Sequence, residues 1–290
     1  MGIALHKRKS SGSTLMTEGT IWKHILLFSI PLILGNMLQQ LYNTVDSIVV
    51  GNSLGSEALA AVGSSSSLIS LLISFSMGAA AGAGVIVSQF IGAQNKKGIH
   101  ESVHTALAIA LILGVVLTVL GITLSPQILR WMGTPDEVMP QSVIYLRLYF
   151  AGLLFSVLYN MASGILNAVG NSKRSLLYLA IASFTNIVLD LLFIPVLKMG
   201  IAGAAIATDI SQVLSAVLCM LYLMRVDESY KVALRKIRIH KEVAVRIIQV
   251  GVPTAIQNTV ISFANVLVQS SVNSYGALAM AGFAAYIKID

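Results

Sequence analysis

Charged residues are scarce in this sequence. Only 11% of its 290 residues are Asp, Glu, Lys or Arg, whereas 56% are hydrophobic and the mean hydropathy is +0.82. A soluble domain carries about 25% charged residues. The composition therefore excludes a soluble domain as the default and predicts a multi-pass membrane protein.

Cysteine is also almost absent, since Cys219 is the single one and lies in an apolar segment. A disulfide framework and a thiolate metal site are both excluded. The net charge of +7 comes from Lys and Arg in short loops between apolar segments, where such residues set membrane orientation. We therefore expect the lipid bilayer as a partner, no nucleic acid, no obligate protein partner and no cofactor.

Apolar runs of about 20 residues recur along the chain, which is the length that crosses a bilayer as a helix. They cover roughly 22–50, 58–88, 103–125, 142–168, 176–196, 203–224 and 244–272, and an eighth begins near Ala277. None alternates with the period of two that membrane β-strands show. The sequence therefore predicts an all-α polytopic membrane protein.

The basic residues predict orientation. Most of the 19 Lys and Arg residues lie on the side of the N-terminal tail, whereas Arg130, Arg147 and Lys198 lie on the other side and Lys288 falls inside the eighth run. Because cytoplasmic loops are enriched in Lys and Arg, we expect a plasma-membrane protein with a cytoplasmic tail over 1–20. The basic linker 225–243 is expected to fix topology; a lipid head-group patch is the alternative.

The start of the chain is repeated weakly near its end. Placing one segment over the other pairs Pro31 with Pro253, Asn36 with Asn258, Asn43 with Asn265 and, after a slip of one residue, Gly55 with Gly276. Internal repeats are typical of transporters. We therefore expect a six-helix lobe over 21–224 and the first one to two helices of a second, repeat-related lobe over 244–290, as in a truncated twelve-helix transporter.

Four polar residues are predicted to share one depth in the outer half of the membrane. Counting helix rise from the segment ends gives this level for Asp46, Asn186, Asp190 and Thr208. Their oxygen atoms could bind Na⁺, or a carboxylate could hold a proton. The alternative is that each Asp only reaches for water at the interface, but ionisable residues inside a membrane are functional candidates by default. Tyr42 and Tyr145 reach the same depth.

One motif would indicate an enzyme instead. His100, Glu101 and His104 fit H-E-x-x-H, the pattern that binds Zn²⁺ in metalloproteases. The Asp residues lie across the membrane, too far away to supply a third ligand. We therefore expect two interfacial histidines and no enzyme, with an intramembrane zinc protease as the alternative.

Small residues over 78–84 are expected to let helices approach closely, because Gly78 and Gly82 have small-xxx-small spacing.

Several segments together resemble the multidrug and toxic compound extrusion (MATE) transporters of bacteria. They are the segment from Gln39 to Asp46 with Val50 and Gly51, Gly55 followed by residues 58–63, residues 168–173, and residues 200–208. The similarity runs from about residue 20 to the end, and it is specific as a set. It implies two six-helix lobes around a V-shaped cavity.

The resemblance also implies a function. Such transporters exchange Na⁺ or H⁺ for organic cations and other amphipathic drugs, and their cation site would fall on Asp46, Asn186, Asp190 and Thr208, with the Ala204 carbonyl and Tyr42 or Tyr145 nearby. We therefore expect a cation-coupled multidrug efflux antiporter. A lipid-linked glycan flippase of the same superfamily is the alternative. Only about one and a quarter lobes are present in the sequence.

Overall fold

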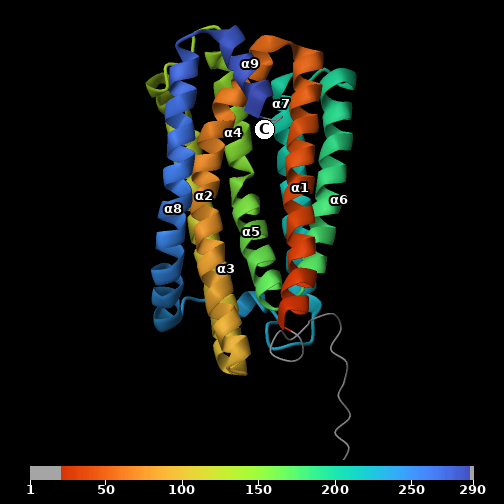
Figure 1. The fold of residues 1–290 in the computed structure, drawn as a ribbon, viewed down its shortest axis with the longest axis vertical. Helices are drawn as coiled ribbons and strands as arrows, with labels where there is room; N and C mark the ends of the chain where they lie inside the picture. The colour runs from red at the N-terminus through yellow and green to blue at the C-terminus, as the bar shows by residue number, and fades with distance from the viewer. Residues whose placement is uncertain (1–20, 288–290) are drawn as a thin grey trace, which may run out of the picture.

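The structure is a computed structural model that describes residues 21–287, which form helices and the segments that join them. The predicted tail 1–20 and Lys288 lie outside the described residues. The long helices run side by side along one axis (Figure 1). In chain order they are α1 (Ile21–Leu54), α2 (Ser56–Gly92), α3 (Lys96–Trp131), α4 (Met139–Ala151), α5 (Leu153–Ala168), α6 (Ser172–Leu191), α7 (Ile201–Arg225), α8 (Lys241–Asn273) and α9 (Ala277–Ile287).

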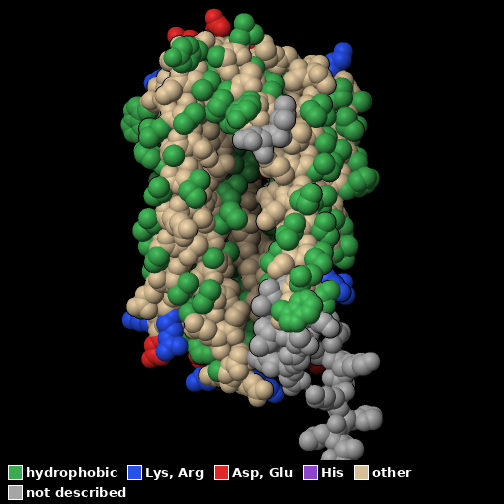
Figure 2. Space-filling view, in the orientation of Figure 1, with side chains coloured by type: hydrophobic (Ala, Val, Ile, Leu, Met, Phe, Trp, Pro, Cys, Tyr) green, Lys and Arg blue, Asp and Glu red, His purple; other side chains and the backbone are tan. Residues whose placement is uncertain are grey.

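The helices have the length and composition of membrane spans. Of the described helices, α2, α3, α6, α7 and α8 are each long and apolar enough to cross a bilayer, and α4 with α5 adds a sixth span if the pair is taken together. α1 runs beside them in Figure 1. Large apolar side chains cover the outer sides of the bundle in Figure 2. The predicted all-α membrane fold is confirmed.

Two predicted helices are interrupted. The run 142–168 was predicted as one helix, which is wrong, because α4 and α5 bend by 48° at Gly152. A Cβ atom at Gly152 would lie 2.1 Å from Oδ1 of Asp209, so a larger residue at the break would require that α7 side chain to move. α6 passes into a π-helical turn, η1 (Leu192–Val196), which contains Pro195.

α2 lies at the centre of the packing and contacts α3, α5, α8 and α9. Its closest neighbour is α8: a Cβ at Gly82 would lie 2.5 Å from the Ile247 carbonyl oxygen, and one at Gly78 would lie 2.4 Å from the Ala255 Cβ. The expectation that small residues here let helices approach closely is confirmed.

The turns that precede α2 and α9 have the same backbone conformation. Gly55 and Gly276 both have positive φ, +88° and +85°, which favours glycine, and a helix starts at the next residue in each case. The aligned glycines of the sequence repeat therefore occupy equivalent turns.

The bundle has one end richer in Lys and Arg, which we call the basic end. It is the end at which α1 and α3 begin and α7 and α8 are joined, and Figure 2 shows Lys and Arg gathered there. The linker between α7 and α8 covers 226–240, slightly shorter than predicted, and contains one 3-10 turn, η2 (Leu234–Lys236). We call the other end of the bundle the far end.

Candidate functional site

The structure brings the four predicted polar residues together from three helices. Asp46 comes from α1, Asn186 and Asp190 come from α6, and Thr208 comes from α7; we call these four the polar cluster. Their side chains are buried, with relative exposures of 8%, 1%, 0% and 8%. The Asn186 Nδ2 donates a hydrogen bond to the Thr208 Oγ1 at 3.4 Å, and Asp190 lies close enough to Asp46 for their charges to interact.

Buried oxygen atoms of the polar cluster lack donors. Both carboxylate oxygens of Asp190 and the Oδ1 of Asn186 have no hydrogen-bond partner among residues 21–287. Buried polar atoms almost always have a partner, and an isolated buried carboxylate is unstable unless it is neutralised. The three oxygens therefore fit a small cation or a proton. The π-helical turn η1 begins two residues after Asp190, and such turns are frequent at functional sites.

The polar cluster adjoins an internal cavity of about 330 Å³, which we call the upper cavity. Asp46, Tyr42 and Tyr145 line it, together with residues from α2, α5 and α7. A second cavity of about 950 Å³, the lower cavity, lies between α1, α2, α5 and α6 on the side of the basic end. The two cavities share lining residues, including Gln39 and Asn160, so they are adjacent. Figure 2 shows the corresponding hollow between the two halves of the bundle.

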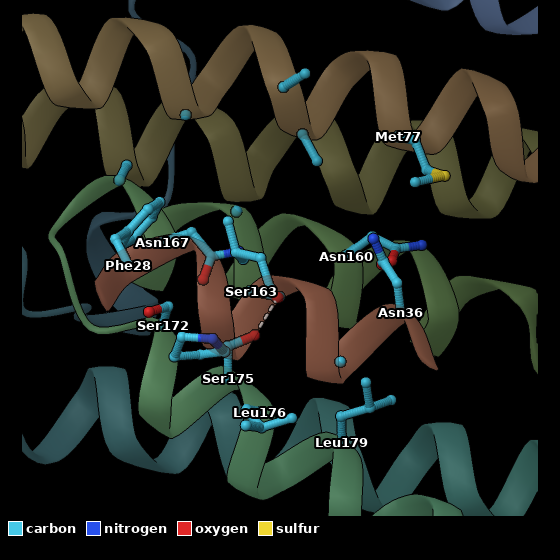
Figure 3. A pocket seen from close by; sticks show the side chains of 18 of the residues that line it. Phe28, Asn36, Met77, Asn160, Ser163, Asn167, Ser172, Ser175, Leu176 and Leu179 are labelled. Atoms are coloured by element: carbon cyan, nitrogen blue, oxygen red, sulfur yellow. Dashed lines mark hydrogen bonds between the residues drawn. The ribbon is translucent and has the colours of Figure 1, made fainter. Parts of the chain in front are cut away.

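The lower cavity is apolar with a few amide and hydroxyl groups. Asn36 of α1 and Asn160 of α5 point toward one another in Figure 3, near Met77 of α2. Ser163 and Ser175 form a hydrogen bond that joins α5 to α6. The lining includes no Asp, Glu, Lys or Arg among the described residues. An apolar wall with a few placed polar groups is typical of small-molecule sites, whose volumes run from about 300 to 1,000 Å³.

The remaining predicted residues lie around the polar cluster. Tyr42 lines both the upper cavity and a small space beside Asn186 and Thr208. Tyr145 is buried, lines the upper cavity and packs near Tyr149, with ring centroids 6.3 Å apart. Ala204 is fully buried one turn before Thr208 on α7.

Sequence reasoning missed the contribution of α2. Ser66, Ser70 and Ser74 line the upper cavity with Tyr149 and Gln212. The three serines recur every fourth residue in an apolar run, so they share one helical face. This spacing is a signal that could have placed them in the site.

The second histidine of the H-E-x-x-H motif bonds to the linker between α7 and α8. The His104 Nδ1 lies 2.8 Å from the His100 carbonyl oxygen, and the His104 Nε2 accepts the N–H of Ala233 at 3.1 Å. Both ring nitrogens are thus engaged with backbone groups, which leaves no lone pair for zinc. In the part of the chain that is described, no group of three or more His, Cys, Asp or Glu residues could hold a metal ion.

Known proteins resemble this chain in sequence. The family model described as MatE matches residues 31–192. "Probable multidrug resistance protein YpnP" of Bacillus subtilis (strain 168) is 35% identical over 274 residues, which cover 94% of this chain and 61% of the relative. The chain thus spans about three fifths of that relative's length.

Solved structures have the same fold. An inward-facing multidrug resistance MATE family transporter of the MOP superfamily gives a TM-score of 0.81 at 30% identity, covering 90% of this chain and 61% of that one. An outward-facing structure, again of a multidrug resistance MATE family transporter, gives 0.80 at 27% identity, covering 97% and 72%.

Proposed function

Because this chain belongs to the MATE family of membrane transporters, we propose that it supplies the cation-binding lobe of a cation-coupled antiporter. The antiporter exports small amphipathic organic cations across the plasma membrane, and the N-terminus is cytoplasmic. The observation that carries the proposal is the set of three buried oxygens without donors on Asp190 and Asn186. It is supported by membership of the family and by the similarity to YpnP, a probable multidrug resistance protein.

The polar cluster would hold Na⁺ or H⁺. Carboxylate, amide and hydroxyl oxygens are hard ligands suited to a hard cation, and a proton on Asp190 would equally remove its buried charge. Asp46 faces the upper cavity while Asp190 lies behind it, so neutralising one carboxylate changes the electrostatic field that a cationic drug meets in the cavity. This competition between a small cation and a drug for negative charge is the coupling that an antiporter needs.

The charges that line the two cavities do not favour the flippase alternative. A lipid-linked glycan carries a diphosphate, which proteins hold with Lys or Arg. Neither cavity has a Lys or Arg among its described lining residues, and Asp46 gives the upper cavity a negative charge. An organic cation suits that lining better than an anion does.

Ion binding is tested on the purified chain through its melting temperature. A bound ion stabilises the folded state in proportion to the logarithm of its concentration. We expect Na⁺, or a lower pH if the ion is H⁺, to raise the melting temperature, and Asp190→Asn to abolish the rise. Asp136→Asn, which changes an exposed loop residue, serves as the matched control and should keep it. If the response to Na⁺ and to pH is the same in Asp190→Asn as in the parent chain, the cluster is not the cation site.

Transport is tested on a chimera in which this chain replaces the matching part of YpnP. We expect cells that carry the chimera to retain less ethidium than cells without it, and Asp190→Asn in the chimera to restore retention. Ethidium retention that stays unchanged, although the chimera is present in the membrane, would contradict the efflux function.

A further inference from the structure

A third cavity, of about 520 Å³, lies at the basic end between the start of α3 and the linker; we call it the basic pocket. α3 contributes Lys97 and His100, and the linker contributes Arg235, Lys236, Arg238 and His240. The proposed transport does not use this pocket, and the polar cluster lies toward the far end.

Positive charge dominates the basic pocket. Its lining has four Lys and Arg side chains, and Glu101 supplies the one carboxylate among the described lining residues. Glu101 is already close to a lysine and a histidine, with Oε1 3.9 Å from the Lys97 Nζ and 3.8 Å from the His240 Nδ1. Within residues 21–287, the side chains of Arg235 and Lys236 have no ion-pair partner. The pocket thus offers unneutralised cations to an anion.

The pocket is held in shape by bonds at both ends of the segment that carries its cations. The Ala233 N–H donates to the His104 Nε2 at 3.1 Å, and the His240 N–H donates to the Thr105 Oγ1, also at 3.1 Å. Between these anchors, the Arg238 Nε donates to the His240 Nε2 at 3.2 Å. The backbone that carries the cations is therefore held in place before any ligand arrives, which lowers the entropic cost of binding.

Apolar side chains beside these cations indicate which anion fits. Leu234 and Ile239 alternate with the basic residues of the linker and are 59% and 46% exposed. A free phosphate ion would leave them in water. A lipid brings both a phosphate for the cations and acyl chains for the apolar side chains, as interfacial segments of this composition require.

We propose that the basic pocket binds the phosphate of an anionic membrane lipid, with Arg235, Lys236 and Arg238 as its main contacts. Basic pockets of this kind on the cytoplasmic side of membrane proteins bind acidic head groups. The bound lipid would fix the linker, and with it the start of α8, against α3. The proposal does not depend on the substrate or on the coupling ion.

Native mass spectrometry of the purified 290-residue chain tests the proposal. The probes are phosphatidylglycerol, phosphatidylcholine with the same acyl chains, and inorganic phosphate. The test variant carries Arg235→Gln, Lys236→Gln and Arg238→Gln. The control carries Lys173→Gln, Arg225→Gln and Lys231→Gln, which remove the same charge from exposed positions outside the pocket. Circular dichroism and size-exclusion chromatography confirm that each variant is folded.

We expect the parent chain and the control to retain phosphatidylglycerol in preference to phosphatidylcholine. The test variant should bind phosphatidylglycerol more weakly, by about fivefold for each charge removed. If the test variant and the control lose phosphatidylglycerol binding equally, the lipid is attracted only by the general surface charge, and the proposal is overturned. Inorganic phosphate that competes fully with phosphatidylglycerol at equal concentration would also overturn it, because the acyl contacts would then contribute nothing.

Discussion

α1 and α8 are related by the sequence repeat but pack in opposite ways. Each is a helix of more than 30 residues that contains a proline at the matched position, Pro31 or Pro253. α1 packs along α6 and leaves the upper and lower cavities between itself and α2, whereas α8 lies against the backbone of α2. The aligned position that is Asp46 in α1 is Val268 in α8, and Val268 is 48% exposed.

This difference in packing indicates that α1 and α8 have different roles. α1 carries a buried carboxylate next to cavities, where a cation or a drug can change its environment. α8 packs closely on α2 through small residues such as Gly251 and Ala255, and Asn273 at its end donates to the Met132 carbonyl oxygen at 3.0 Å. We therefore infer that substitutions in the α8 contact change stability, and that substitutions in α1 change ion dependence.

The largest effect is expected for Gly82→Leu. A Cβ there would lie 2.5 Å from the Ile247 carbonyl oxygen and 2.7 Å from the Gly251 Cα, and neither backbone atom can move aside cheaply. Overpacking of this kind costs about 1–3 kcal/mol or more. The melting temperature and the folded fraction on size-exclusion chromatography should both fall. Gly92→Leu, at a position with open space around it, is the control; equal behaviour of the two variants would refute the tight contact.

Asp46→Asn should act on coupling instead of on folding. Coupling between two sites usually changes affinity by about 5- to 150-fold. We expect Na⁺ or pH to lose this effect on drug affinity in the variant. Drug affinity is measured by dye fluorescence at several Na⁺ concentrations and pH values. Asp209→Asn is the control, since Asp209 is a carboxylate of α7 that contacts Gly152 outside the polar cluster. The comparison of α1 with α8 fails if Asp46→Asn lowers the melting temperature but leaves the ion dependence intact.

The sequence predicted the apolar spans, though not the break at Gly152, and it marked the residues of the polar cluster as candidates. A bilayer forces backbone groups to bond within each segment, so apolar length alone predicts the spans. Polar residues such as Asp46 and Asp190 are conspicuous in such runs, and helix rise places them at one depth. Gly55 and Gly276 marked the repeat because only glycine adopts their φ values easily.

Contacts between residues that are far apart in the sequence could not be predicted in this way. Gly152 at the break lies next to Asp209 of α7, and the role of His104 depends on Ala233, 129 residues later in the chain. The upper cavity requires the serines of α2 to face α1, which follows from the packing of the whole bundle. The local pattern H-E-x-x-H therefore did not reveal that its second histidine accepts a hydrogen bond from the linker.

His104→Ala tests how α8 is held at its start. The variant leaves the Ala233 N–H without its acceptor, and an unmade buried hydrogen bond costs about 1–3 kcal/mol. The melting temperature should fall, and limited proteolysis within the linker should become faster. His100→Ala is the matched control, since its carbonyl oxygen, which His104 uses, is retained. If added zinc stabilises the parent chain and His104→Ala abolishes that effect, the motif is a metal site after all.

The smallest effect is expected for Ser262→Ala, in the middle of the α2–α8 contact. The Ser262 and Ser74 hydroxyls lie 2.7 Å apart and bond across the two helices. Such bonds between membrane helices contribute about 0.6 kcal/mol on average, because the separated helices also find polar partners. Thermal unfolding of Ser262→Ala, Ser74→Ala and the double variant gives the free energy of the bond between the two serines. Ser271→Ala is the control, because the Ser271 hydroxyl bonds within its own helix. A loss as large as that of Gly82→Leu would mean that polar bonding, and not close backbone packing, fixes α8 on α2.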